Sequence, residues 1–268
     1  KYSITRLKEA TILKKGNKKL KVFENKTVYL ADEYNKAIEK YFGGNGVVVL
    51  AMNGYSDIGK DKCKMYGIKE EAYEKACAAL LEGMILKLQT EFKGLKVCIA
   101  HGASNMGVDK VAINVALKHN LPQLGFSCPE YLQYVEDDDI PVFVAEDKHG
   151  YCDAFTSALD ILVTANGRAT TFEMDIDAVF KKHKDVIPVN VMKVISENGG
   201  PPAKDENGNI EDAVAFWFLK MHNVASDMGL KGVEDWTHLN ERVQKTTCNI
   251  CRQLLPASRA FGYDWFKE

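Results

Sequence analysis

A nine-residue loop gathers the side chains best suited to binding a phosphate. Residues 165–173 read Ala-Asn-Gly-Arg-Ala-Thr-Thr-Phe-Glu between an expected strand and an expected helix. Asn and Gly tolerate positive φ, Arg is a phosphate-type donor, and hydroxyls at a helix start lie where anions bind. Glu173 falls in the first turn of the expected helix, where an acidic residue commonly serves as a helix cap. The candidate ligand-binding residues are Asn166, Gly167, Arg168, Thr170 and Thr171.

A second loop, at residues 101–109, reads His-Gly-Ala-Ser-Asn-Met-Gly-Val-Asp. Its small residues let a ligand approach the backbone, and the first N–H groups of the helix that follows favour an anion. The alternative is a tight turn whose glycines serve packing. His101 either contacts the ligand or simply ends a strand, and both roles stay open. The candidate phosphate-binding residues are Gly102, Ser104, Asn105 and Gly107.

The candidate loop nearest the N-terminus, at residues 53–57, reads Asn-Gly-Tyr-Ser-Asp. In chain order, the loops at 53–57, 101–109 and 165–173 are the first, second and third loop. Gly54 permits a tight turn, and the Ser56 hydroxyl can meet a phosphate or a ribose. The alternative is an ordinary surface turn.

Alternating apolar segments indicate how these loops are held. The run at 47–52 is continuously apolar, as in a strand buried on both faces. Strands that alternate with helices predict a parallel sheet covered on both sides, so we expect an α/β, Rossmann-like three-layer sandwich. We expect the strands 47–52, 96–100 and 161–165 to be neighbours whose carboxyl ends form one crevice. Further strands are expected at 121–126, 141–145 and 186–191, and helices at 70–92, 108–118, 151–159 and 171–183.

The chain divides into three parts. Residues 1–45 are expected to form an N-terminal extension, with a β-hairpin turning at 15–18 and a helix that ends near Phe42. Residues 46–195 are expected to form a Rossmann-like nucleotide-binding core. A breaker run begins at Asn198, so residues 196–268 are expected to form a loop and a C-terminal helical extension.

Two of the loops resemble motifs of known families. Residues 165–173 resemble the Pro-Gly-Gly-x-Gly-Thr-x-x-Glu motif of the cytokinin-activating phosphoribohydrolases, the LOG or lysine decarboxylase-like family: Gly167, Thr170 and Glu173 match. Residues 107–117 resemble the Gly-Ile-Asp-x-x-Ala-x-x-x-Ala-Leu pattern of the DNA-processing protein A family. Both families belong to the SLOG superfamily of Rossmann-like nucleotide-binding domains. The resemblance spans about residues 47–195 and implies a nucleotide or nucleotide-like ligand.

Three functions follow from this resemblance. The first is nucleotide binding, as a sensor or carrier. It is favoured because the family's Arg-Lys pair is missing before the third loop, where only Lys148 and His149 stand. The alternative is an N-glycosidase-type nucleoside 5′-monophosphate phosphoribohydrolase, in which Glu173 would stabilise charge on the ribose or activate water. The second alternative is single-stranded DNA binding.

Composition narrows the classes of partner. The chain has 35 Lys and Arg against 37 Asp and Glu, a formal net charge of −2, so we expect no nucleic acid. Seven cysteines, an odd number, suit free thiols in a reducing compartment and predict a cytoplasmic location. No apolar stretch reaches the roughly 18 residues of a membrane span. Cys248 and Cys251 have the spacing of half a zinc site but no second pair nearby, so we expect no metal and no cofactor. A homo-oligomer is left open.

Overall fold

The computed structural model describes the central part of the chain. The described residues are 12–15, 18–21, 28–43, 46–57, 63–64, 67–135, 140–167, 171, 175, 178–179, 182, 184–189, 191 and 195. The predicted C-terminal extension and the residues Arg168, Thr170, Glu173, Cys248 and Cys251 lie outside them.

The described core is built on a parallel sheet of seven strands in the order β3-β7-β6-β5-β4-β8-β9, with every neighbouring pair parallel. This confirms the predicted Rossmann-like α/β class. The strands are β3 (Val28–Leu30), β4 (Val47–Gly54), β5 (Lys96–His101), β6 (Gln123–Ser127), β7 (Val142–Val144), β8 (Ile161–Ala165) and β9 (Asp185–Val189).

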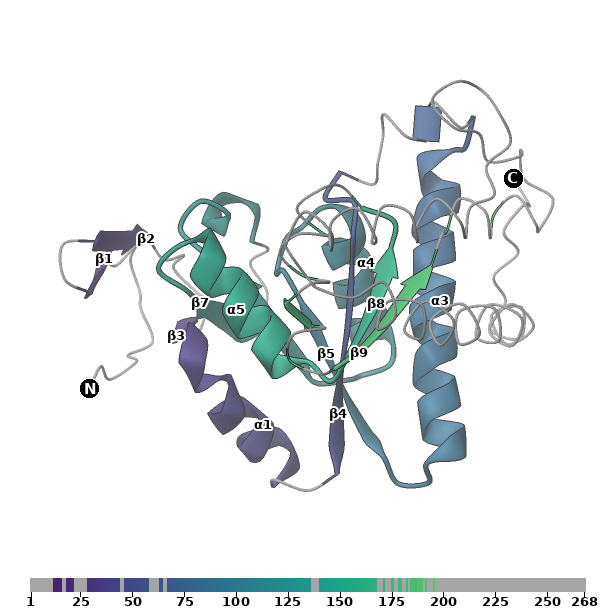
Figure 1. Cartoon of the computed structure of the whole chain (residues 1–268), viewed down its shortest axis with the longest axis horizontal. Coiled ribbons are helices and arrows are strands. Elements are labelled where there is room, and N and C mark those ends of the chain that lie inside the picture. The colour runs from purple at the N-terminus through teal and green to yellow at the C-terminus, as the bar shows by residue number, and fades with distance from the viewer. Residues whose placement is uncertain are drawn as a thin grey trace, which may run out of the picture.

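Helices cover both faces of the sheet. Side chains alternate along β4, so Leu50 and Met52 join one buried cluster while Val49 and Ala51 join the other. The helices α3 (Glu70–Glu91) and α4 (Gly107–Lys118) pack on the first face. The helices α1 (Tyr34–Phe42) and α5 (Lys148–Ala158) pack on the second. Figure 1 shows α3 across the sheet from α1 and α5, as a three-layer sandwich requires.

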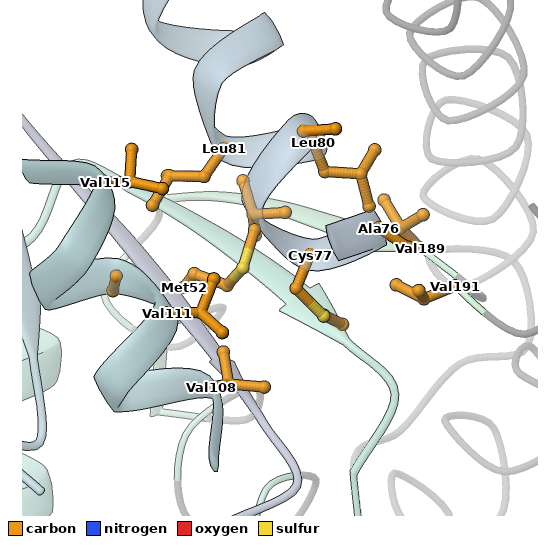
Figure 2. Packing of buried hydrophobic residues seen from close by; sticks show 14 of the residues in the cluster. Met52, Ala76, Cys77, Leu80, Leu81, Val108, Val111, Val115, Val189 and Val191 are labelled. Atoms are coloured by element: carbon orange, nitrogen blue, oxygen red, sulfur yellow. The ribbon is translucent and has the colours of Figure 1, made fainter. Parts of the chain in front are cut away.

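The first face is held together by apolar side chains at helical spacing. Ala76, Cys77, Leu80 and Leu81 of α3 are at most 2 % exposed. Figure 2 shows them beside Met52 of β4 and a row of valines on α4 and the end of the sheet. Residues four apart share one side of a helix, which is why this row can face the sheet along two turns of α3.

The segment before the core takes part in the sheet. The strands β1 (Ile12–Lys15) and β2 (Lys18–Lys21) form the predicted antiparallel hairpin. However, β3 pairs in parallel with β7, and α1 contributes Ala37 and Phe42 to the second core cluster. The strand and helix that the sequence analysis grouped with an extension are therefore the edge strand and a covering helix of the same sandwich.

The helix α5 begins earlier than the sequence predicted. It starts at Lys148 rather than at residue 151 because Asp147 caps it, accepting a hydrogen bond from the N–H of Gly150 at 2.9 Å.

The strand order reverses direction between β4 and β8. After β4 the chain steps outward through β5, β6 and β7, and then returns to the other side of β4 with β8 and β9. The predicted adjacency of the strands at 47–52, 96–100 and 161–165 is confirmed. In open parallel sheets such a switch point is where ligands bind, at the carboxyl ends of the strands.

Candidate functional site

The loop after β4 lies across the N-terminus of α4. The carbonyl oxygen of Tyr55 accepts a hydrogen bond from the N–H of Val108 at 3.1 Å. Gly107 has a φ of +60°, and a Cβ at this position would collide with the backbone of Tyr55 and Ser56. The close approach of the two backbones requires this glycine, so its Cα packs against the protein's own chain and not against open space.

Gly54 has a similar packing role. A Cβ there would lie 2.5 Å from the carbonyl oxygen of Ala165 and 2.8 Å from a methyl group of Val108. The Tyr73 hydroxyl donates to the same Ala165 carbonyl. Glycine therefore lets the end of β4 approach both β8 and α4. For Gly107, the structure supports the packing role that the sequence left as the alternative. Gly54 packs against the chain as well, although the alternative stated for its loop was a surface turn.

The second loop uses its backbone N–H groups within the chain. Gly102 donates to Oδ1 of Asp109 at 2.7 Å, and Asn105 donates to the carbonyl of Tyr134 at 2.7 Å. Met106 donates to the Ser104 hydroxyl oxygen at 3.2 Å. The predicted cradle of N–H groups for a phosphate is thus occupied at these positions by the protein's own acceptors. Among the candidate residues of the first two loops, Ser56 and Asn105 are exposed and Ser104 is partly exposed.

His101 is a buried structural residue. Its side chain has no measurable exposure, and its Nδ1 accepts the N–H of Ala103 at 3.0 Å. Since Nδ1 is an acceptor, the ring proton lies on Nε2, which is 3.1 Å from Oε1 of Gln123. Of the two roles left open by the sequence, the structure supports the one at the end of a strand.

Asp109 stands in the first turn of α4, facing the end of β5. Burial raises the pKa of its carboxyl to about 7, the charge of Asp175 adds to the rise, and the N–H groups of Gly102 and Ser104 oppose it. A Cβ at position 102 would collide with Oδ2 of Asp109 and lie 2.8 Å from the Tyr151 hydroxyl. The second loop is therefore wrapped around a carboxyl group of the protein.

Asp175 connects the chain after β8 to the end of β4. Its Oδ2 accepts a hydrogen bond from Nδ2 of Asn53 at 2.9 Å, and the Cys152 thiol of α5 also bonds to it. Burial raises the pKa of Asp175 to about 6, although these two donors and the charge of Lys148 oppose the rise. Burial also raises the pKa of the Cys152 thiol, and Asp175 adds to that effect.

Through its hydroxyl, Tyr151 interacts electrostatically with both carboxyl groups. Burial raises the pKa of its hydroxyl well above the usual value, and the charges of Asp109 and Asp175 raise it further. These residues come from β4, α4, α5 and the chain after β8. We call Asn53, Asp109, Tyr151 and Asp175 the carboxyl cluster. It lies at the switch point that the strand order defines.

Two buried oxygens beside the carboxyl cluster have no hydrogen-bond partner. They are Oδ1 of Asn53 and Oγ1 of Thr164. Asn53 is 9 % exposed and Thr164 is fully buried. The two residues face each other in register across β4 and β8, so the oxygens belong to the same side of the sheet. Such groups are costly, because burial removes them from water without replacing the lost hydrogen bond.

The described part of the third loop is held by contacts within the chain. Asn166 has a φ of +58°, and its Oδ1 accepts the N–H of Val191 at 2.9 Å. Gly167 has a φ of +149°, and a Cβ there would come within 2.7 Å of the Thr171 side chain. Asn166 and Gly167 thus adopt the positive φ expected of them. Their ligand contacts, and those of the other candidate residues in this loop, stay predictions.

Most of the carboxyl cluster is not among the residues that the sequence predicted for the site. Asp175 carried a usable signal, because Thr171, Asp175 and Val179 are spaced by four and therefore share a helical face. Thr171 and Val179 are buried, at 7 % and 0 % exposure, and the backbone is helical at all three positions. The pairing of Asn53 with Thr164 needed the strand register, which no local pattern shows.

Other kinds of site are missing from the described residues. They contain no group of three or more His, Cys, Asp or Glu that could hold a metal ion. None of their helices is long and apolar enough to cross a membrane. The five described cysteines, Cys63, Cys77, Cys98, Cys128 and Cys152, are buried.

Comparisons with known proteins give only a distant likeness. No family model and no curated protein matches the chain. Among solved structures, it is similar to the molybdenum cofactor binding protein from the phototrophic bacterium Rippkaea orientalis, with a TM-score of 0.36 and 17 % identity over 53 % of this chain and 74 % of that chain. It is also similar to the molybdenum cofactor carrier protein MCP from Chlamydomonas reinhardtii, with a TM-score of 0.37 and 15 % identity over 66 % of this chain and 86 % of that chain. At this level of similarity neither protein's ligand transfers to the chain.

Proposed function

We propose that the chain binds a nucleotide or a nucleotide-derived small molecule at the carboxyl edge of β5, β4 and β8, as a sensor or carrier. The observation that carries this proposal is the hydrogen bond between Asn53 and Asp175, which joins polar side chains from distant parts of the chain at the switch point. Ligands of open parallel sheets bind at this place. The exposed side chains of Ser56 and Asn105 belong to the two neighbouring loops and are suited to polar contacts with a ligand.

The third loop is the part of this site that would hold the phosphate. The likeness of residues 165–173 to the phosphoribohydrolase motif supports this role for Gly167, Thr170 and Arg168. A guanidinium can bind a phosphate through two parallel hydrogen bonds. The second loop would contribute the side chains of Ser104 and Asn105 instead of backbone donors, since its N–H groups already bond within the chain.

Calorimetry with the full chain tests the proposal. AMP, GMP, CMP, UMP and NAD would be titrated separately, and at least one is expected to bind. Arg168→Met should weaken the binding of that nucleotide about tenfold or more, because a charge-assisted contact to the phosphate is lost. Lys36→Met removes the same charge from an exposed site on α1 and should change nothing. Absence of binding for all five probes would contradict the proposal.

One observation favours an enzyme as the second candidate. The pKa values of Asp109 and Asp175 are raised to about 7 and about 6, so near neutral pH one carboxyl can donate a proton while the other accepts one. Such a pair suits hydrolysis of an N-glycosidic bond. In the phosphoribohydrolase alternative it would act beside Glu173, which the family motif marks as the catalytic carboxylate.

Release of free base decides between binding and catalysis. Each nucleoside 5′-monophosphate would be incubated with the chain, and the base would be measured by chromatography. The binding proposal expects no release above the rate without protein. Turnover that disappears in Glu173→Ala or Asp175→Asn, with the melting temperature Tm retained, would establish the enzyme instead.

A further inference from the structure

The described part of the site offers acceptors where a phosphate needs donors. The N–H groups of Gly102, Asn105 and Met106 are bonded to the protein's own oxygens. Beside them lie the carboxyl groups of Asp109 and Asp175, which repel an anion whenever they are ionised. A group that donates hydrogen bonds fits this surrounding better than one that accepts them.

The unpartnered oxygens are an independent sign of the same preference. Oδ1 of Asn53 can only accept a hydrogen bond, and Oγ1 of Thr164 can accept or donate one. Both are buried. The Asn53 oxygen lies next to the Asp175 carboxyl, because the same amide donates to Asp175, and Thr164 is paired with Asn53 across β4 and β8. Buried polar atoms normally have partners, so an unsatisfied pair at a switch point suggests that the missing partner arrives with the ligand.

Sugar hydroxyls are the part of a nucleotide that meets these requirements. They are neutral donors, they come as an adjacent pair on a ribose, and a carboxylate can accept from them. The oxygens of Asn53 and Thr164 are enclosed in the ligand-free chain. Sugar hydroxyls can therefore reach them only if neighbouring side chains shift.

We propose that the carboxyl cluster binds the sugar hydroxyls of the nucleotide and not its phosphate. This inference rests on the proposed function and adds the orientation of the ligand. The sugar edge lies at Asn53, Asp175 and Thr164, and the phosphate lies toward the third loop. The N-terminus of α4, covered by the Tyr55 carbonyl, is not the phosphate site.

A cycle of ligand and protein variants tests this orientation. For whichever nucleotide binds, its 2′,3′-dideoxy analogue should bind the wild-type chain about 10- to 100-fold more weakly, as expected when hydrogen bonds to a charged group are lost. In Asp175→Asn, replacing the nucleotide by its dideoxy analogue should weaken binding less than about threefold, because the charged acceptor is already missing. Asp32→Asn, at an exposed position after the opposite edge strand, should keep the full loss.

Thr164→Val is a second variant that tests the proposal even if Asp175→Asn does not fold. Valine has the shape of threonine without the unpartnered hydroxyl. The variant should therefore raise the Tm of the ligand-free chain while it weakens binding of the ribonucleotide. A purely structural threonine would not move stability and affinity in opposite directions. A fall in Tm, or an unchanged affinity, would count against the proposal.

The outcomes separate this inference from the proposed function. If no nucleotide binds, both fail. If a nucleotide binds but its dideoxy analogue binds equally well, only the orientation is wrong.

The base is the other part of a nucleotide that can donate hydrogen bonds. An analogue that lacks the exocyclic amine of the base tests whether the base lies at the carboxyl cluster. If removing the amine weakens binding to the wild-type chain but not to Asp175→Asn, the carboxyl cluster contacts the base and the sugar assignment is overturned. Tighter binding of the monophosphate to Asp175→Asn, with no effect of the hydroxyls, would place the phosphate at the cluster.

Discussion

Nδ2 of Asn53 lies 2.9 Å from Oδ2 of Asp175, although 122 residues separate the two along the chain. The bond joins the carboxyl end of β4 to the segment that follows β8, on either side of the point where the strand order reverses. It therefore fixes the two halves of the sheet to each other at the position where an open parallel sheet binds its ligand.

The raised pKa values predict how stability changes with pH. Asp109 and Asp175 hold protons more tightly in the folded chain than in the unfolded chain, where the pKa of Asp is about 3.9. Between about pH 4 and pH 7 the folded state thus binds more protons, so the contribution of these groups to stability falls as pH rises. Asp109→Asn should flatten this part of the Tm profile and raise Tm at pH 8 relative to the wild type.

This pH profile needs the surroundings of Asp109 to be intact. The groups that face it are Asp175, the Tyr151 hydroxyl, and the N–H groups of Gly102 and Ser104. Asp32→Asn, at an exposed position, is the matched control and should leave the profile unchanged. A profile that is the same for Asp109→Asn and the wild type would show that this carboxyl titrates at its ordinary pKa.

Two glycines with the same backbone angle should respond differently to substitution. Gly107 and Gly46 have φ values of +60° and +59°, but a Cβ at 46 would meet nothing within 4 Å. Gly46→Ala should cost only the strain of a left-handed residue, about 1 kcal/mol. Gly107→Ala should cost about 2 kcal/mol more, because its methyl group would collide with the backbone of Tyr55 and Ser56. Urea denaturation measures both, and equal losses would contradict the packing role.

A buried glutamate with a half-exposed lysine as partner joins α3 to the end of α4, away from the site. Oε1 of Glu82, whose side chain is fully buried, accepts from Nε2 of His119 at 2.7 Å and from Nζ of Lys118 at 2.9 Å. Lys118→Met should lower stability by about 1–3 kcal/mol, since it leaves a buried carboxylate with one partner fewer. Adding Glu82→Met should recover most of that loss. A double variant less stable than Lys118→Met alone would contradict this account.

The sequence predicted the sheet better than the site because the two depend on different ranges of contact. The apolar run at 47–52 and its successors identify buried strands locally, and their helical connections imply parallel pairing. Gly54 and Gly107 were recognised as special positions. A glycine in a sequence does not show whether a ligand or a peptide lies against its Cα, and here the chain's own backbone does.

The carboxyl cluster is harder to predict, because it is formed by contacts between residues that are far apart in the sequence. Asp109 lies in the second loop and matches the pattern of the DNA-processing protein A family, but an acidic residue at a helix start is common and does not by itself indicate a site. The motif directed attention to Glu173, whereas Asp175 shares a four-residue spacing with the buried Thr171 and Val179. Thr164 gave no signal at all, since its position opposite Asn53 follows from the register of β8 against β4.

The unpartnered oxygens of Asn53 and Thr164 also bear on the lifetime of the protein in a cell. They lower the stability of the empty chain, and a ligand that satisfies them stabilises the folded state by mass action. Proteases act on whichever molecules unfold, so the empty form would be removed faster than the occupied form. If the proposed ligand binds there, its supply would set how much of the protein persists, and abundance itself would report the ligand's concentration.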